Sequence, residues 1–225
     1  MPGEMIEFAA NGGTAAGYLA TPPSGQGPGL IVIQEWWGLV DHIKEVADRF
    51  AAEGFVALAP DLYRGDNTTD PDEAGRKLMA LDIAQTGKDL RGAADHLLGL
   101  DAVTPKKVGA LGFCMGGQLA LFAATEHDQV SACVNFYGIH PNVGPDFSKL
   151  RCPVLAHFAN DDGFVTPDNA RALIEEIRGA GGTIDPHFYE AGHAFFNDSR
   201  PDAYAEGPAK QAWERSLEYL RANLG

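Results

Sequence analysis

Continuously apolar runs alternate along the chain with segments whose apolar residues recur every three or four positions. The run GLIVIQ at 29–34 is typical of a strand buried on both faces of a sheet. The segment 42–54 that follows places its apolar residues on one helical face and ends on Gly54, where a helix C-cap is expected. The pattern therefore predicts a buried strand and then an amphipathic helix.

The same alternation continues to the end of the chain, after an opening hairpin predicted from 5–10 and 14–20. Further strands are predicted at 55–60, 107–113, 130–138, 152–160 and 183–190. Further helices are predicted at 71–82, 86–100, 115–125, 166–182 and 207–224. Strands that alternate with helices indicate an α/β fold with a mostly parallel sheet covered on both faces, and the length of 225 residues fits one domain spanning 1–225.

Four residues with chemical potential each stand shortly after a predicted strand, namely Glu35, Cys114, Asp162 and His193. In open parallel sheets, ligands bind outside the carboxyl ends of the strands. A nucleophile, an acid and a base are therefore expected to meet at one edge of this sheet.

The composition argues against several classes of partner. Asp and Glu number 31 against 17 Lys and Arg, and the formal net charge of −14 has the wrong sign for nucleic acid or anionic lipid. No apolar run approaches the roughly 20 residues that span a bilayer, and the start MPGEMIEF lacks the features of a signal peptide. We expect a cytoplasmic protein that acts on a small molecule, with no nucleic-acid or membrane partner.

The three cysteines are widely spaced, which indicates neither a disulfide framework nor a metal site. Cys133 and Cys152 lie inside predicted strands and are interpreted as core residues. Cys114 differs, because the stretch GFCMG at 112–116 is the nucleophile-elbow pattern G-x-S-x-G with Cys in place of Ser. The glycines permit the sharp turn that lifts the thiol above the sheet.

The elbow position favours a reactive thiol. A helix is predicted to begin directly after Cys114, and the partial positive charge at a helix N-terminus favours thiolate over thiol. The backbone N–H of Met115 can also face an oxyanion. The chain order of nucleophile, acid and histidine is that of α/β-hydrolases, which makes Cys114, Asp162 and His193 a candidate triad.

With these residues in place, the chain resembles the dienelactone hydrolase family of α/β-hydrolases over nearly its whole length. The matching stretches are IQEWWG around Glu35, APDLYRG at 59–65, GFCMGGQLA around Cys114, NFYG at 135–138, DDGFV around Asp162 and AGHAFFN around His193. The resemblance implies the α/β-hydrolase fold and a carboxylic ester hydrolase, similar to carboxymethylenebutenolidase. It implies neither a metal nor a cofactor.

The resemblance also implies roles for particular residues. Cys114, His193 and Asp162 would form the triad, and the backbone N–H groups of Met115 and Trp36 would form the oxyanion hole. The thiolate would attack an ester or lactone carbonyl to give a thioester, which water activated by His193 would hydrolyse.

The roles of Asp162 and Glu35 are inferred from the family resemblance more than from the sequence pattern. Asp161 and Asp162 are adjacent, and the family's acid stands three residues before a valine, here Val165, which favours Asp162. A buried Glu35 is implied beside the thiol, where it would hold the resting thiol until substrate turns it towards His193.

Substrate contacts are predicted less directly. Trp36, Trp37, Tyr137 and Phe164 adjoin strand ends, where aromatic residues either line a pocket or fill the core.

Family members that act on dienelactone are expected to hold its carboxylate with two arginines, one after the PDLYRG segment and one four residues beyond the histidine. The second position is Asn197 in this chain, and Arg76 only approximates the first. Arg200 or Arg64 could substitute. Because Asn supplies no charge, we expect a weakened preference for anionic substrates.

Other functions remain open on the sequence. An activated Cys114 could be a redox sensor without turnover, although no resolving cysteine is indicated beside it. A thioesterase or peptidase could use the same fold and the same triad. The expected partner is a small lactone or ester, with the chain acting as a monomer or small homo-oligomer.

Overall fold

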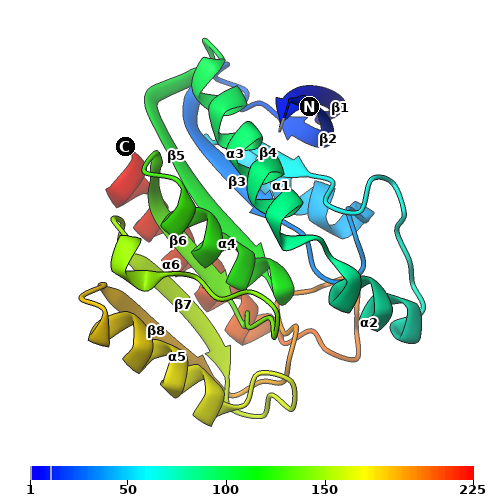
Figure 1. The fold of residues 1–225 in the computed structure, drawn as a ribbon, viewed down its shortest axis with the longest axis vertical. Helices are drawn as coiled ribbons and strands as arrows, with labels where there is room; N and C mark the ends of the chain where they lie inside the picture. The colour runs from blue at the N-terminus through cyan, green and yellow to red at the C-terminus, as the bar shows by residue number, and fades with distance from the viewer. Residues whose placement is uncertain (1, 11) are drawn as a thin grey trace.

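A single sheet runs through the part of the chain that the computed structural model describes, residues 2–10 and 12–225. Its strands are β1 (Glu4–Ala10), β2 (Gly13–Ala20), β3 (Gly27–Ile33), β4 (Val56–Pro60), β5 (Val103–Phe113), β6 (Val130–Phe136), β7 (Val154–Ala159) and β8 (Ile184–Tyr189). They are hydrogen-bonded in the order β1-β2-β4-β3-β5-β6-β7-β8 (Figure 1). Strands β3 to β8 pair in parallel, whereas β1 and β2 form an antiparallel hairpin that joins β4. The predicted hairpin and mostly parallel sheet are confirmed.

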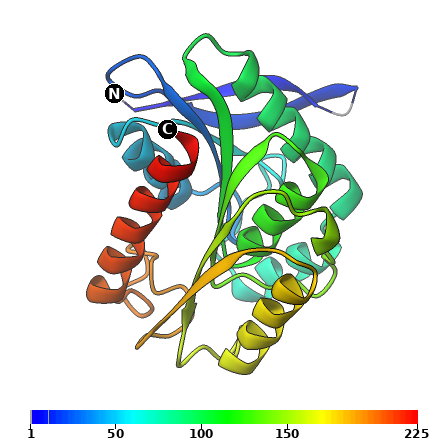
Figure 2. The same ribbon diagram turned by 90° about the vertical axis from the view of Figure 1, so that its left-hand side faces the viewer.

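Helices cover both faces of this sheet. They are α1 (Asp41–Ala52), α2 (Pro71–Ala80), α3 (Ile83–Gly99), α4 (Met115–Glu126), α5 (Pro167–Gly179) and α6 (Glu206–Leu224), with a short 3₁₀ turn at Phe147–Lys149. Figure 2 shows α1 and α6 on one side of the sheet and α3, α4 and α5 on the other. Each layer buries its own apolar cluster against the sheet, with Phe50 and Leu220 on the first side and Leu97 and Leu119 on the second. This two-sided burial explains why the central strands are continuously apolar.

The helix ends follow from local hydrogen bonding. Asp70 and Thr166 cap α2 and α5 by accepting from backbone N–H groups three residues further on. Helix α3 begins at Ile83, earlier than the predicted 86, because the Asp82 side chain accepts from the N–H of Gln85 at 2.9 Å. After α1, Gly54 adopts a φ of +101°, the left-handed conformation expected of a residue that ends a helix.

The topology gathers the carboxyl ends of the parallel strands at one edge. Strands β3 and β5 are neighbours, and β7 and β8 follow on the same side of β5. Glu35, Cys114, Asp162 and His193 lie just beyond these four ends. Within residues 2–10 and 12–225, no helix combines the length and the apolar character needed to cross a bilayer.

Candidate active site

Cys114 occupies a sharp turn between β5 and α4. Its backbone has φ +53° and ψ −124°, and its N–H donates to the carbonyl of Phe136 at 3.0 Å. A side chain at Gly112 would collide with the backbone of Gly116, and one at Gly116 would collide with the carbonyl of Gln34. The two glycines are therefore required by close backbone packing, which is the physical basis of the elbow pattern.

Backbone strain is concentrated around this turn. Among the described residues, four that are not glycine have a positive φ, and three of them are Cys114, Tyr137 and Ala194. Tyr137 follows β6, and Ala194 comes directly after His193. Strained backbone of this kind costs about 1–3 kcal/mol per residue and persists where the surrounding structure enforces it, often at functional sites.

His193 and Asp162 form a close pair. His193 Nδ1 lies 2.7 Å from Asp162 Oδ2, and the Asp162 side chain is fully buried. The other carboxylate oxygen accepts from the N–H groups of Phe164 at 2.7 Å and Val165 at 2.8 Å. The neighbouring Asp161 is exposed. Asp162 is thus the aspartate that reaches the imidazole, and its orientation is fixed by the loop after β7.

The environment of His193 favours its charged form. Burial lowers the pKa of this imidazole, but the hydrogen bonds to Asp162 and Cys114, together with the charges of those two groups, outweigh burial and raise the pKa to about 10. The ring is also enclosed by Tyr137 and Phe164, each with its ring centroid 5.1 Å from that of His193. The arrangement suits an imidazolium held between a carboxylate and a sulfur.

Glu35 is buried beside this group, with 1% of its surface exposed. Its Oε2 accepts a 2.7 Å hydrogen bond from the side-chain amide of Asn197. Burial raises the pKa of Glu35, and this effect is opposed by the Asn197 hydrogen bond and by the charges of His193 and Arg200. The resemblance implied that Glu35 holds the resting thiol. In the structure, the Glu35 carboxylate is held by Asn197, and the Cys114 sulfur interacts with His193.

Cys114 opens into a cavity of about 450 Å³, referred to below as the Cys114 cavity. Its walls are mainly apolar and come from the segments that follow β3, β5, β6, β7 and β8 and from α2. They consist of Glu35, Trp36, Trp37, Pro71, Gly75, Leu78, Met79, Cys114, Ile139, Pro141, Phe164, Val165, His193, Ala194 and Arg200. Phe164 and Met79 are exposed at 71% and 54%, so two large apolar side chains remain uncovered in the wall of this cavity.

The structure brings together most of the predicted site residues. Trp36, Trp37 and Phe164 line the Cys114 cavity. Tyr137 is instead fully buried and packs against the ring of His193. Met115 is the first residue of α4, directly beside the thiol.

Asn197 is also buried, and its amide is engaged with Glu35 rather than exposed to the Cys114 cavity.

The structure distinguishes the three candidate arginines by their positions. Arg76 is exposed on α2 and is not among the described residues that line the Cys114 cavity, because Gly75, Leu78 and Met79 form the side of the helix that faces it. Arg64 pairs with Asp89 at 3.2 Å. Arg200 is the only lysine or arginine among the described residues that lines this cavity.

Several contributors were missed by the sequence analysis. The apolar residues Leu78 and Met79 of α2 form part of the cavity wall, and their positions three and four residues after Gly75 were a signal that could have been used. Tyr63, in the PDLYRG segment, donates its hydroxyl to the Met115 sulfur at 3.4 Å. Asp61 fixes that segment by accepting from the N–H groups of Tyr63 and Gly65.

Comparison with known proteins places this geometry in a family. Residues 15–224 match the family model described as the dienelactone hydrolase family. The chain belongs to the dienelactone hydrolase family. The fold is accordingly the α/β-hydrolase fold, as the sequence resemblance implied, and the family is one of hydrolases.

Relatives of this family member match over nearly their whole length. The protein usf of Aquifex pyrophilus is 39% identical over 99% of each chain. A carboxymethylenebutenolidase from a Pseudomonas species is 33% identical, over 95% of this chain and 92% of the relative. A solved dienelactone hydrolase-like promiscuous phosphotriesterase from metagenomic libraries superposes with a TM-score of 0.84 at 25% identity, covering 100% of both chains.

Proposed function

We propose that this protein hydrolyses small lactones or short carboxylic esters through Cys114, His193 and Asp162, by way of a thioester. The observation that carries the proposal is the buried 2.7 Å contact between His193 and Asp162, with the imidazole also interacting with a thiol raised on a strained elbow. These are the parts of a nucleophile, a base and a group that orients the base.

In the proposed reaction, the Cys114 thiolate attacks the carbonyl carbon and forms a C–S bond. The negative charge moves to the carbonyl oxygen, where the backbone N–H groups of Met115 and Trp36 are the candidate donors. As the tetrahedral intermediate collapses, the bond to the alkoxy oxygen breaks and His193 gives that oxygen its proton. His193 then removes a proton from water, which attacks the thioester and releases the acid with the thiolate restored.

The Cys114 cavity supports the choice of substrate. A volume of about 450 Å³ with mainly apolar walls suits a small lactone ring or a short acyl chain. Arg200 supplies one cation to this cavity, but its guanidinium already lies 2.7 Å from Asp202. A substrate with a free carboxylate would have to compete with that ion pair, so neutral lactones and esters are favoured.

A redox sensor without turnover receives less support. Burial raises the pKa of Cys133 well above its usual value and that of Cys152 to about 12, which makes both thiols poor partners for sulfur exchange. Both belong to the apolar cluster on the side of the sheet covered by α3, α4 and α5. A thioesterase or peptidase would use the same triad, and it differs only in the preferred leaving group.

Turnover assays with a neutral lactone, a short alkyl ester, a thioester and a peptide amide test this proposal. We expect the lactone and ester to be hydrolysed by the wild-type protein, and Cys114→Ala to lower kcat/KM at least about 1000-fold with an unchanged circular dichroism spectrum. Mass spectrometry of a rapidly quenched reaction should detect the acyl group on Cys114. Near wild-type turnover by Cys114→Ala would exclude the thiol mechanism.

A further inference from the structure

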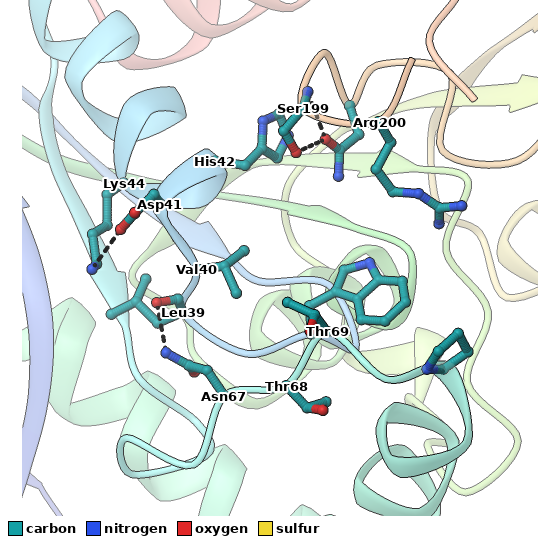
Figure 3. Close-up of a pocket in the computed structure, with 13 residues that line it drawn as sticks. Leu39, Val40, Asp41, His42, Lys44, Asn67, Thr68, Thr69, Ser199 and Arg200 are labelled. Carbon is teal, nitrogen blue, oxygen red and sulfur yellow. Dashed lines mark hydrogen bonds and ion pairs between the residues drawn. The ribbon is translucent and has the colours of Figure 1, made fainter. Parts of the chain in front are cut away.

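A second cavity of about 660 Å³ lies beside the Cys114 cavity, and we call it the side cleft. Trp37, Pro71 and Arg200 line both cavities, so the two spaces meet at these residues. In Figure 3, Leu39 and Asn67 lie on one side of the side cleft and Ser199 and Arg200 on the other. The side cleft is larger than the cavity that holds the thiol, and the reaction proposed above leaves it without a role.

One wall of the side cleft is hydrogen-bonded to Glu35, which lines the Cys114 cavity. Asn197 lines the side cleft, and its amide nitrogen donates to Glu35 in the wall of the Cys114 cavity. The Asn197 carbonyl oxygen accepts from the backbone N–H and the hydroxyl of Ser199, which also lines the side cleft. This wall is the segment that follows His193, the residue proposed to protonate the leaving group.

The charges in the side cleft are balanced in the protein itself. Lys44 lies 3.1 Å from Asp41, and Arg200 lies 2.7 Å from Asp202. His42 is buried, and burial lowers its pKa despite the nearby Asp198, so the imidazole is neutral at pH 7. An anionic ligand would therefore find no uncompensated cation among the described residues that line this space.

Polar and aromatic groups remain available to an uncharged ligand. The Ser199 hydroxyl donates a hydrogen bond to Asn197 Oδ1, which leaves the hydroxyl oxygen as an acceptor for a ligand O–H group. Helix α1 begins in the side cleft at Val40 and Asp41 without a side-chain cap. The Trp37 ring lines the side cleft between the Trp36 ring, 5.0 Å from it, and the Arg200 guanidinium, 5.5 Å from it, and provides an aromatic surface against which a ligand ring can pack.

We propose that the side cleft binds the alcohol portion of the substrate, and that this portion is an uncharged ring that carries hydroxyl groups. The inference rests on the proposed hydrolase function and adds the leaving-group class to it. The alcohol side is assigned because its oxygen receives a proton from His193, so the rest of the alcohol continues along the 197–200 wall. The acyl side stays in the Cys114 cavity with the apolar residues of α2.

Acetate esters whose alcohols have similar intrinsic reactivity test the assignment. We compare kcat/KM for methyl, phenethyl and dihydroxyphenethyl acetate, and for methyl dihydroxyphenylpropanoate, which carries the same ring on the acyl side. The wild-type protein should prefer dihydroxyphenethyl acetate over methyl acetate by about tenfold or more. The proposal would be overturned if only methyl dihydroxyphenylpropanoate were preferred over methyl acetate by that factor. It would also be overturned if neither ring-bearing ester were preferred over methyl acetate.

Thr69→Trp fills the side cleft from a position that lines it and is exposed. This variant should lower the dihydroxyphenethyl-to-methyl ratio of kcat/KM at least about fivefold. Thr14→Trp is the matched control, because Thr14 is an exposed threonine on the β1–β2 hairpin outside both cavities. An unchanged ratio in Thr69→Trp would contradict the proposal.

The two proposals can fail separately. If no ester in the series is hydrolysed, the hydrolase function fails, and calorimetric titration of wild type and Thr69→Trp with dihydroxyphenethyl alcohol still tests the side cleft. Binding by wild type that Thr69→Trp weakens at least about fivefold supports the site, and equal binding or no binding by the two proteins refutes it.

Discussion

Asn197 donates a 2.7 Å hydrogen bond to Glu35 across 162 positions of sequence, and the carboxylate that it holds lies in the wall of the Cys114 cavity. Because Asn197 brings no charge, the burial of Glu35 is only partly compensated and its pKa stays raised. A change in the charge of this carboxyl group would therefore take place in the wall of the cavity that the imidazole and the thiol also line.

The first prediction concerns this coupling. Glu35→Gln should shift the pH profile of Cys114 alkylation to lower pH by about half a unit or more, because a neutral amide removes a negative charge that opposes the thiolate. Iodoacetamide labelling rates measured across pH, with Glu45→Gln as a control at an exposed position on α1, provide the test. Superimposable profiles for wild type and Glu35→Gln would show that Glu35 does not tune the thiol.

The second prediction separates the adjacent aspartates. Asp162→Asn should lower kcat at least about 100-fold, since the buried carboxylate that fixes the imidazole and stabilises its charge is lost. Asp161→Asn should stay within about threefold of wild type, because Asp161 is exposed.

NMR titration of His193 measures the pKa of its imidazole directly. A change in this pKa distinguishes an aspartate that contacts the imidazole from one that only supports the fold. The pKa of His193 should fall from its raised value in Asp162→Asn and remain unchanged in Asp161→Asn. The opposite pattern for the two variants would assign the acid to Asp161.

The sequence predicts which residues lie together at this edge of the sheet, because each of them comes shortly after a strand. The positions of Cys114, Asp162 and His193 could be predicted because each follows a predicted strand, and parallel strands bring their carboxyl ends to one edge. The elbow was readable because close packing at Gly112 and Gly116 requires glycine, so the steric constraint appears directly in the sequence.

Contacts between distant segments could not be predicted in the same way. The partner of Glu35 is a loop residue far along the chain, and only the packed structure shows that Asn197 points to it. The position of Arg76 outside the cavity wall could not be predicted, because the position of a helix in the sequence does not say which of its sides faces a cavity formed by other segments. The side cleft, formed by three separated segments, left no local signal.

The third prediction concerns Arg200 and the preference for anionic substrates. Arg200 is the only lysine or arginine among the described residues that lines the Cys114 cavity, and it is paired with Asp202. Wild type should therefore prefer dienelactone over a neutral lactone of similar size by less than about 1000-fold in kcat/KM, about 4 kcal/mol. Asp202→Asn should raise this ratio and Arg200→Gln should lower it, each by about threefold to tenfold.

Arg76→Gln is the matched control, because Arg76 is exposed on α2 outside the cavity. It should leave the ratio unchanged. A wild-type preference of about 1000-fold or more would instead reveal a complete cationic clamp, and a loss of preference in Arg76→Gln would restore that residue to the site.

The fourth prediction concerns stability in acid. His157, a residue of β7, is fully buried against β8 and α6, with Nδ1 2.9 Å from the Tyr189 hydroxyl and Nε2 3.0 Å from Ser216 Oγ. The Ser216 hydroxyl donates a hydrogen bond to the carbonyl of Ala212. His157 Nε2 is therefore the donor to Ser216, and His157 Nδ1 accepts from the Tyr189 hydroxyl. Burial, together with the charges of His187 and Arg215, lowers the pKa of His157 well below its usual value.

The direction of the pH dependence follows from this lowered pKa. Below about pH 6.5 the unfolded chain takes up a proton on His157 and the folded protein does not, so the free energy of unfolding falls as pH decreases. Between about pH 7.5 and pH 5.5 this residue alone accounts for a loss of about 1.4 kcal/mol. His193, whose raised pKa is about 10, is protonated in both states below about pH 6.5, and its contribution is lost only as pH rises towards 10.

Urea denaturation at the two pH values measures the effect. His157→Gln should be less stable than wild type at about pH 7.5, because Tyr189 and Ser216 lose an ideally placed partner, yet its stability should fall by about 1 kcal/mol less on acidification. His187→Gln, at a partly exposed position on the neighbouring strand, should keep most of the wild-type fall, because burial lowers the pKa of His157 more than the charge of His187 does. If His157→Gln and wild type lost the same free energy between the two pH values, His157 would have to titrate in the folded protein, and the buried Tyr189–His157–Ser216 arrangement would not hold a neutral imidazole.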